Sequence, residues 1–153
     1  MIKRQIQMMM MAVEKARKAL MQPYFINLGL TVGEGQPRIL NMLLKHGSMT
    51  QRELADACHL DVTTLSRTID RMAGAGLLSR EPHGSSRRAY AVVLTSLGRE
   101  KAAEVSRGFQ ALDEILCRGF TPQQMEQLYE MLKQMEQNLK QAEDAGELGP
   151  FHA

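Results

Sequence analysis

The chain has 153 residues, of which 44% are hydrophobic and 24% charged, and its formal net charge is +2. This balance indicates one soluble globular domain large enough to bury a core, and it excludes a disordered chain. Aromatic residues make up only 5% of the chain and Met occurs 12 times, which favours a core packed between helices over a β-sandwich.

The cysteine content and the hydropathy pattern predict a cytoplasmic protein. Cys58 and Cys117 are too few for a disulfide framework and indicate a reduced compartment. The apolar run Met8–Val13 near the basic start is too short for a signal peptide, and no stretch reaches the length of a membrane span. We therefore expect no membrane partner.

The first predicted element is a helix over residues 2–20 with a single apolar seam. Apolar residues recur there at alternating spacings of four and three, which is the period of one helix face. Pro23 is expected to end or kink this helix. The seam consists of Ile2, Ile6, Met9, Val13, Ala16 and Leu20.

A second helix is predicted from Pro37 to the residue before Gly47, after a loop marked by Gly33 and Gly35. Proline suits the first position of a helix because its backbone nitrogen needs no partner there. The buried face is expected to hold Ile39, Leu40, Leu43 and Leu44.

A short helix is predicted to follow Thr50. Thr50 and Glu53 have the spacing of a capping box, in which each side chain satisfies a backbone N–H at the start of a helix. Its apolar face is expected to hold Leu54, Ala57 and Cys58.

Asp61 is the predicted cap of the next helix, residues 62–73, and Gly74 or Gly76 can end it. Two helices joined by a few residues are typical of a helix-turn-helix. Residues 77–81 and 89–94 then have a strand-like period and predict a β-hairpin whose loop ends in two arginines. Together these parts predict a winged helix-turn-helix.

Two long amphipathic helices are predicted after the hairpin, separated by a second capping box at Thr121 and Gln124. One winged domain cannot cover their seams and that of the first helix, so we expect a second copy of the chain to do so. The two seams hold Ala102, Val105, Phe109, Leu112 and Leu116, and Met125, Leu128, Leu132, Met135, Leu139 and Ala142.

The predicted fold class is mainly α, a winged helix-turn-helix with a small β-hairpin wing and a dimerisation frame of N- and C-terminal helices. The expected organisation is a single structural domain, residues 1–145, followed by a flexible tail over 146–153. Within it, residues 1–30 are the N-terminal dimerisation helix, 36–95 the DNA-binding region and 96–145 the C-terminal dimerisation helices.

The helix after Asp61 can be sorted by face at about 100° per residue. Leu65, Ile69 and Met72 cluster and are predicted to pack inward. Hydroxyl groups and arginines on the opposite side suit the major groove, where arginine can bond guanine bidentately; an ordinary solvated face is the alternative. The predicted DNA contacts on this helix are Thr63, Thr64, Ser66, Arg67 and Arg71, with Asp70 on the same side.

Arg87 and Arg88 at the hairpin tip are further predicted DNA contacts. Their guanidinium groups would reach a phosphate or a narrow, negative minor groove. Alternatively, an arginine there pairs with a carboxylate of the domain and shapes the wing. We expect one of the two to contact DNA and the other to be structural.

A family resemblance is carried by the runs GLTVGEGQPRIL, MTQRELADACHLDVTTLSRTIDRMAGAGLLSR and RRAYAVVLTSLG. In these runs the chain resembles the MarR family of winged helix-turn-helix regulators. The resemblance implies a homodimer with interleaved terminal helices on a pseudo-palindromic operator, contacted by Arg67 and Arg88. Ser86 stands where the family usually has an aspartate that would orient an arginine, which leaves the role of Arg87 open.

The resemblance also implies a repressor that releases DNA when a small lipophilic or aromatic effector enters a crevice beside the winged region. Plain core packing is the alternative for the residues that would line it. Those candidates are Tyr24, Phe25, Leu28, Met42 and Phe109.

Rival functions find little support in the sequence. Cys58 and Cys117 lie on or next to apolar seams and are expected to be packing residues, although a thiol-responsive regulator stays an alternative. The histidines are scattered and predict no metal site, although a metal-responsive regulator of this fold also stays open. No catalytic constellation is present, so we expect neither an enzyme nor a cofactor. A dimeric interaction module that does not bind DNA is the alternative from another class.

Overall fold

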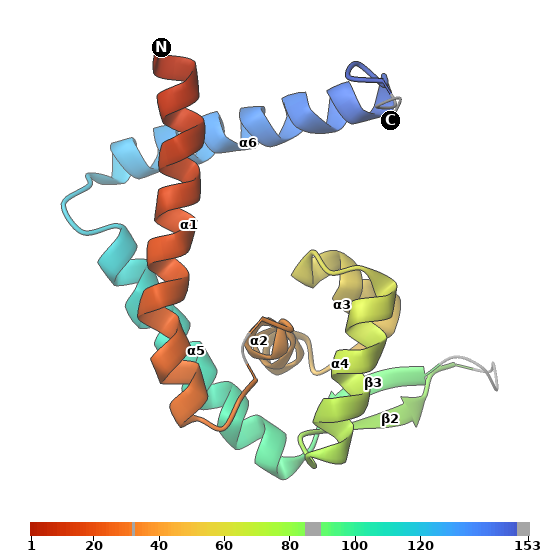
Figure 1. The fold of residues 1–153 in the computed structure, drawn as a ribbon. Helices are drawn as coiled ribbons and strands as arrows, with labels where there is room; N and C mark the ends of the chain where they lie inside the picture. The colour runs from red at the N-terminus through yellow and green to blue at the C-terminus, as the bar shows by residue number, and fades with distance from the viewer. Residues whose placement is uncertain (32, 85–89, 150–153) are drawn as a thin grey trace. The chain divides into compact units, whose positions relative to one another are not determined.

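The computed structural model describes residues 1–31, 33–84 and 90–149 (Figure 1). The residues group into two compact units, Met1–Leu112 and Asp113–Ala153. The predicted mainly helical fold with a small antiparallel sheet is confirmed. The elements in order are α1 (Ile2–Asn27), α2 (Gln36–His46), β1 (Ser48–Thr50), α3 (Gln51–Cys58), α4 (Val62–Gly74), β2 (Leu78–Pro82), β3 (Tyr90–Leu94), α5 (Ser96–Leu116) and α6 (Pro122–Asp144).

Helix α1 continues through Pro23 to Asn27, so it does not end at the proline, and the alternative of a kink there stays a prediction. An interior proline removes one backbone hydrogen bond, and here tertiary contacts hold the flanking residues. Phe25 is buried, and the Tyr24 hydroxyl donates to the carbonyl oxygen of Glu104 in α5 at 2.6 Å. No helix among the described residues is long and apolar enough to cross a membrane.

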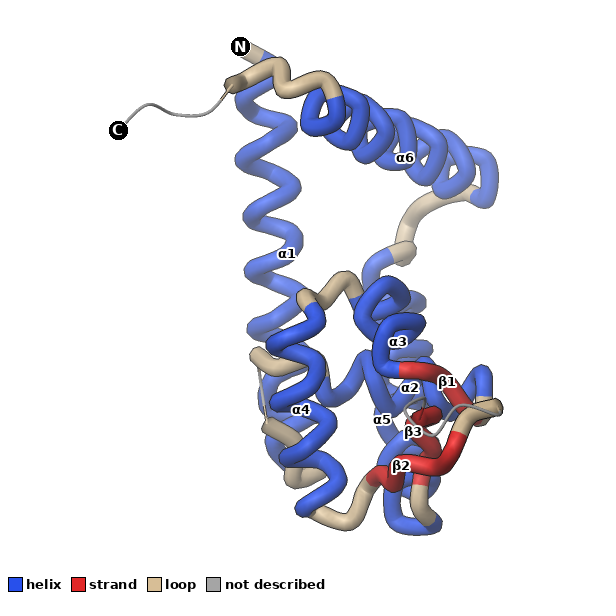
Figure 2. The backbone as a smooth tube through the Cα atoms, turned by 90° about the vertical axis from the view of Figure 1, so that its right-hand side faces the viewer, coloured by secondary structure: helices blue, strands red, loops and turns tan. Residues whose placement is uncertain are grey.

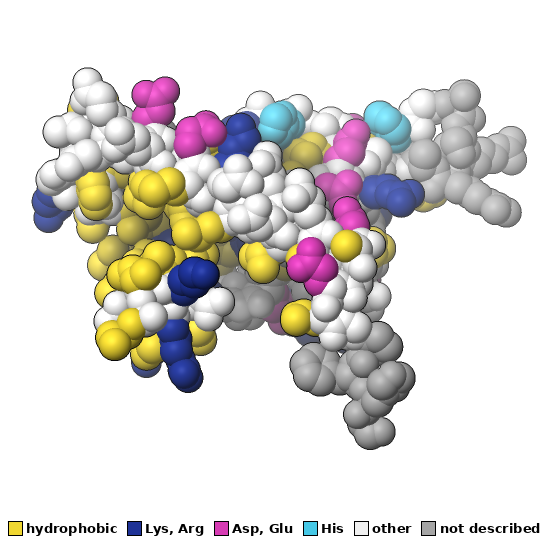
Figure 3. All heavy atoms as spheres, turned by 90° about the horizontal axis from the view of Figure 1, so that it is seen from above, with side chains coloured by type: hydrophobic (Ala, Val, Ile, Leu, Met, Phe, Trp, Pro, Cys, Tyr) yellow, Lys and Arg dark blue, Asp and Glu magenta, His cyan; other side chains and the backbone are white. Residues whose placement is uncertain are grey.

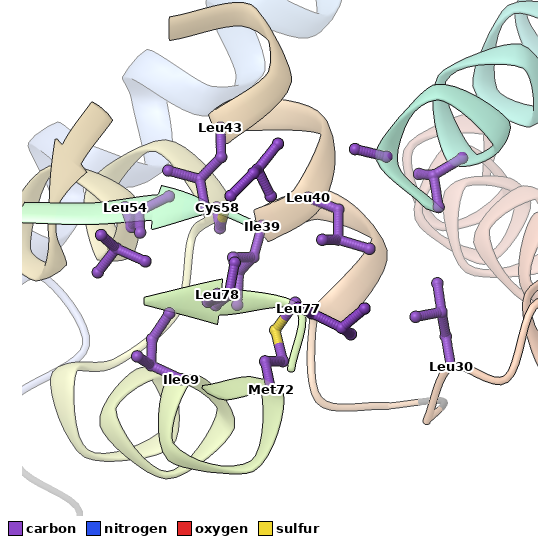
Figure 4. Packing of buried hydrophobic residues seen from close by; sticks show 14 of the residues in the cluster. Leu30, Ile39, Leu40, Leu43, Leu54, Cys58, Ile69, Met72, Leu77 and Leu78 are labelled. Carbon is purple, nitrogen blue, oxygen red and sulfur yellow. The ribbon is translucent and has the colours of Figure 1, made fainter. Parts of the chain in front are cut away.

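The core of the first unit lies between α2, α3, α4, the sheet and the inner face of α5. Figure 4 shows Ile39 from α2, Ile69 from α4 and Leu78 from β2 directed into the same apolar space. Burying one such side chain contributes about 2 kcal/mol. The largest fully buried side chains are Ile39, Leu40, Leu43, Leu54, Leu65, Ile69, Met72, Val92, Val105, Thr68 and Cys58.

Two expected core positions are wrong. Leu44 is 38% exposed at the edge of α2, whereas Ile39, Leu40 and Leu43 are buried as predicted. In α3, Ala55 is buried and Ala57 is exposed. This short helix packs against both α2 and α4, so its buried face is broader than the apolar pattern indicates.

The sheet has three antiparallel strands in the order β1-β3-β2 (Figure 2). The predicted hairpin is confirmed as β2 and β3, and Val92 at its centre pairs with Arg80 on one side and Met49 of β1 on the other. Sequence reasoning missed β1 because three residues are too few to show a strand period. This short strand joins the end of α2 to the wing.

The start of α5 is fixed to the end of α4 by Thr95 and Gly98. The Thr95 hydroxyl donates to the carbonyl oxygen of Gly76 at 2.6 Å and accepts from the backbone N–H of Gly98 at 3.0 Å. A Cβ at position 98 would overlap the carbonyl oxygen of Leu77, so only glycine fits this close approach. These contacts explain the threonine and the glycine of the run VVLTSLG, which are Thr95 and Gly98.

In the second unit, α6 begins at the predicted capping box. The Thr121 hydroxyl accepts from the backbone N–H of Gln124 at 3.2 Å, and the Gln124 side chain accepts from that of Thr121 at 2.9 Å. None of the residues of α6 is buried. Its seam residues Leu128 and Leu132 are 43% and 42% exposed.

The N-terminal half of α1 also exposes its seam: Met9 is 62% exposed and Val13 47%. Hydrophobic side chains are visible at the surface in Figure 3. Exposed apolar seams such as those of α1 and α6 are typical of interaction surfaces. The predicted dimerisation parts, residues 1–30 and 96–145, stay predictions.

Candidate nucleic-acid interface

Helices α3 and α4 form the predicted helix-turn-helix, with both starts capped. Thr50 and Glu53 exchange the hydrogen bonds of the capping box at 3.2 and 2.8 Å. Asp61 accepts from the backbone N–H of Thr64 at 2.8 Å and from its hydroxyl at 2.6 Å. These bonds lower the pKa of the Asp61 carboxyl, and those to Thr50 lower the pKa of the Glu53 carboxyl.

The inward face of α4 is as predicted: Leu65, Ile69 and Met72 are fully buried. Thr68 joins this face, and its hydroxyl shares its one proton between the carbonyl oxygens of Thr64 at 2.9 Å and Glu34 at 3.1 Å. The hydroxyl is therefore satisfied within the protein, and the helix is held firmly on one side.

The outward face of α4 carries the predicted DNA contacts. Thr63 and Arg67 are exposed, while Thr64 and Ser66 are half-buried. The Thr64 hydroxyl donates a hydrogen bond to Asp61. Arg67 has no ion-pair partner among the residues that the structure describes, unlike Arg71 and Arg80. Such an arginine can make two hydrogen bonds to a base edge.

Arg71, also a predicted contact, forms an ion pair with Glu34 in the loop between α1 and α2. Asp70 pairs with Arg80 of β2 at 2.6 Å, and Arg80 also donates to the Gln51 side chain at 3.1 Å. Sequence reasoning missed Glu34 and Arg80 as partners of α4, and Gln51 as a partner of Arg80, since no local spacing connects them. Together they fix α4 to the loop before α2, to α3 and to the wing.

The predicted wing contacts Arg87 and Arg88, together with Ser86, lie outside the described residues. Strands β2 and β3 pair antiparallel, so Pro82 and Tyr90 lie opposite each other at one end of the hairpin. The roles of Arg87 and Arg88 stay predictions.

A cavity of about 270 Å³ lies within the first unit and is lined by residues of α1, the α1–α2 loop, α2 and α5. Phe25 and Phe109 line it, with ring centroids 5.5 Å apart in an edge-to-face arrangement. The other three predicted effector residues, Tyr24, Leu28 and Met42, do not line it.

Three basic side chains, Arg17, Lys18 and Arg38, also line this cavity. Arg17 donates two hydrogen bonds to Glu14, at 2.6 and 2.8 Å, and lowers the pKa of that carboxyl to about 2. Arg38 donates to the carbonyl oxygen of Cys58 at 2.7 Å. Aromatic edges beside guanidinium and ammonium groups suit a planar molecule with an anionic group.

The two cysteines differ. Cys58 is buried as expected, and its burial raises the pKa of the thiol. Cys117 is exposed, so the expectation that it packs with the α5 seam is wrong. The described ranges contain no group of three or more His, Cys, Asp or Glu side chains that could hold a metal ion.

Residues 34–90 match the model of the MarR family. Among solved structures, the chain is similar to AbsC, a MarR family transcriptional regulator from Streptomyces coelicolor, with 26% identity and a TM-score of 0.78 over 90% of this chain and 93% of that one. The fold is also that of a MarR family protein from Listeria monocytogenes solved with 26mer DNA, with 19% identity and a TM-score of 0.78 over 94% and 95% of the chains. A mutant MarR from E. coli solved with operator DNA has 24% identity and a TM-score of 0.71 over 88% and 92%.

Proposed function

We propose that this chain, which through residues 34–90 is a member of the MarR family, is a sequence-specific DNA-binding repressor. It acts as a homodimer on a pseudo-palindromic operator in the cytoplasm. The observation that carries the proposal is the outward face of α4, where Arg67 stands exposed on a helix that is capped at Asp61 and buried on its other side. The proposed DNA contacts are Thr63, Thr64, Ser66, Arg67, Arg71, Arg87 and Arg88.

Dimerisation is supported by the apolar seams that the chain leaves exposed. Leu128 and Leu132 in α6 and Met9 and Val13 in α1 are all more than 40% exposed. Seams of three- and four-residue spacing are covered by a second helix in coiled coils and bundles. A second copy of this chain supplies such helices, and dimerisation places two copies of α4 on successive turns of DNA.

Effector control is supported by the cavity of the first unit, because its lining residue Arg38 donates to the carbonyl oxygen of Cys58 at the end of α3. We propose a small aromatic effector with an anionic group, held by the rings of Phe25 and Phe109 and by the basic side chains that line the cavity. In this proposal, the effector-bound form releases DNA. Displacement of DNA by aromatic acids, but not by their neutral amides, would support this assignment.

The proposal is tested by selecting DNA from a random-sequence duplex library with the wild-type protein. We expect enrichment of one pseudo-palindromic duplex, with an affinity that falls steeply as salt concentration rises because phosphate contacts release counterions. A protein that enriches no duplex, while sedimenting as a dimer, would instead be an interaction module. A monomer that binds DNA without sequence preference would also contradict the proposal.

A further inference from the structure

The loop between α1 and α2 lies against the recognition helix as well as against the cavity. Gly33, Gly35 and Arg38 line the cavity. Glu34, which stands between the two glycines, contacts α4 instead, since its carboxylate forms the ion pair with Arg71. Both glycines have positive φ, +90° and +79°, which allows this short segment to turn Glu34 toward α4.

Residues 34 and 35 hold the helix-turn-helix at three points. The carbonyl oxygen of Glu34 accepts the Thr68 hydroxyl at 3.1 Å, and its carboxylate pairs with Arg71 one turn further along α4. Gly35 packs against Leu60 in the turn between α3 and α4, so closely that a Cβ there would lie 2.6 Å from Leu60 Cδ1. Contacts to the turn and to two positions on α4 fix the rotation of α4 about its own axis.

The rotation of α4 determines where Arg67 is directed. At about 100° per residue, Arg71 lies roughly 40° around α4 from Arg67, and Thr68 roughly 100° from it in the same direction. Loss of one anchor on the Glu34 side would let α4 roll and move Arg67 away from a base edge. A bidentate hydrogen bond from Arg67 to a base edge requires one orientation of the side chain, whereas a contact with a phosphate tolerates a small rotation of α4.

We propose that Glu34 is a positioning residue for DNA recognition, which holds α4 from the α1–α2 loop through Arg71 and Thr68. The inference rests on the proposed DNA-binding function. Glu34 is anionic and lies near the DNA-facing side of α4, so simple electrostatics predicts that removing its charge strengthens DNA binding. A positioning role predicts the opposite for the specific sequence, which separates the two explanations by sign.

The test compares Glu34→Gln with the wild type on the duplex that the wild-type protein enriches and on a scrambled duplex of the same composition. We expect the affinity for the enriched duplex to fall about tenfold, because a charge-assisted contact to α4 is lost. Affinity for the scrambled duplex should stay the same or rise. Asp56→Asn on the exposed surface of α3 removes the same charge without changing a contact of Glu34 with α4. This variant should not weaken binding to either duplex.

Glu34→Asp separates reach from charge, because it keeps the carboxylate and shortens the side chain by one methylene. We expect it also to lose affinity for the enriched duplex, with a melting temperature close to that of the wild type. If Glu34→Gln fails to fold, Glu34→Asp decides the outcome. The inference is overturned if these folded variants discriminate between the duplexes as well as Asp56→Asn does. If the wild type enriches no duplex, the proposed function fails first.

Discussion

Helices α4 and α6 carry the same kind of apolar pattern but differ completely in burial. In α4, Leu65 and Ile69 are fully buried, whereas Leu128 and Leu132 in α6 are 43% and 42% exposed. Both pairs repeat at helical spacing, so the period alone does not distinguish a core from an interface. The difference is that other elements of the same chain cover α4, while no residue of α6 is buried in the described structure.

The uncovered sides of the two helices differ in chemistry. The outward side of α4 is polar and basic, which suits DNA. The uncovered side of α6 is apolar, which suits a second helix of the same kind. The winged region therefore covers its own apolar seam, whereas the proposed dimer would cover that of α6.

The largest expected effect is loss of the dimer in Leu132→Glu. A carboxylate buried in the α6 seam without a partner should cost about 3–5 kcal/mol of association free energy. Sedimentation at micromolar concentration would then give a monomer mass. Gln127→Glu places the same charge outside the seam and should leave the dimer intact. A dimeric Leu132→Glu, or a monomeric wild type, would contradict the assignment of α6.

Within the winged region, Gly98→Ala should lower the free energy of unfolding by about 2 kcal/mol, because the new Cβ would overlap the carbonyl oxygen of Leu77. Urea unfolding measures this change. Gly74→Ala in α4 is the matched control, since a Cβ there meets nothing within 4 Å. It should leave stability unchanged or raise it by about 0.5 kcal/mol. Equal effects of the two variants would show that the contact at residue 98 is unimportant.

Arg67→Ala should weaken binding to the enriched duplex by about 1–2 kcal/mol and relax preference at one base pair, since a base contact is lost. Fluorescence anisotropy on duplexes with single base-pair changes measures both effects. Arg107→Ala removes the same charge from the exposed surface of α5 and should change the affinity less. If Arg67→Ala keeps the wild-type sequence preference, then Arg67 does not contact a base.

Arg88→Ala should weaken binding to all sequences to a similar, smaller extent. If the side chain contacts a phosphate, the slope of log affinity against log salt falls by about 1. The slope is measured between low and physiological salt, with Arg87→Ala measured in parallel. Two unchanged slopes would make both wing arginines structural.

The smallest expected effect concerns the cap of α4. Because its hydrogen bonds to Thr64 lower the pKa of Asp61 in the folded state, the carboxylate stabilises the fold above its unfolded pKa. This contribution is lost as the pH falls through the folded pKa. Asp61→Asn keeps a capping side chain that does not titrate, so its melting temperature should fall less steeply on acidification. Asp56→Asn, which caps no helix, should retain the wild-type profile, and identical profiles for all three proteins would contradict the prediction.

Local determinants made much of the fold predictable. Thr50 with Glu53, Asp61, and Thr121 with Gln124 each specify a helix start through residues three positions apart, and all three caps are confirmed. The inward face of α4 followed from period alone. The continuation of α1 through Pro23 could not be predicted from the sequence, because a contact with α5 overrides the local preference of proline.

The sequence by itself determined the winged helix-turn-helix and the candidate arginine on its recognition helix, because caps, turns and helical period act between near neighbours. Only the tertiary structure decided which amphipathic faces the chain covers itself, and which side chains hold α4 in place. Glu34 and Arg80 contact α4 from other segments of the chain, and Gln51 in α3 accepts a hydrogen bond from Arg80. Such contacts depend on how distant segments pack in space, so the spacing of residues along the sequence does not predict them.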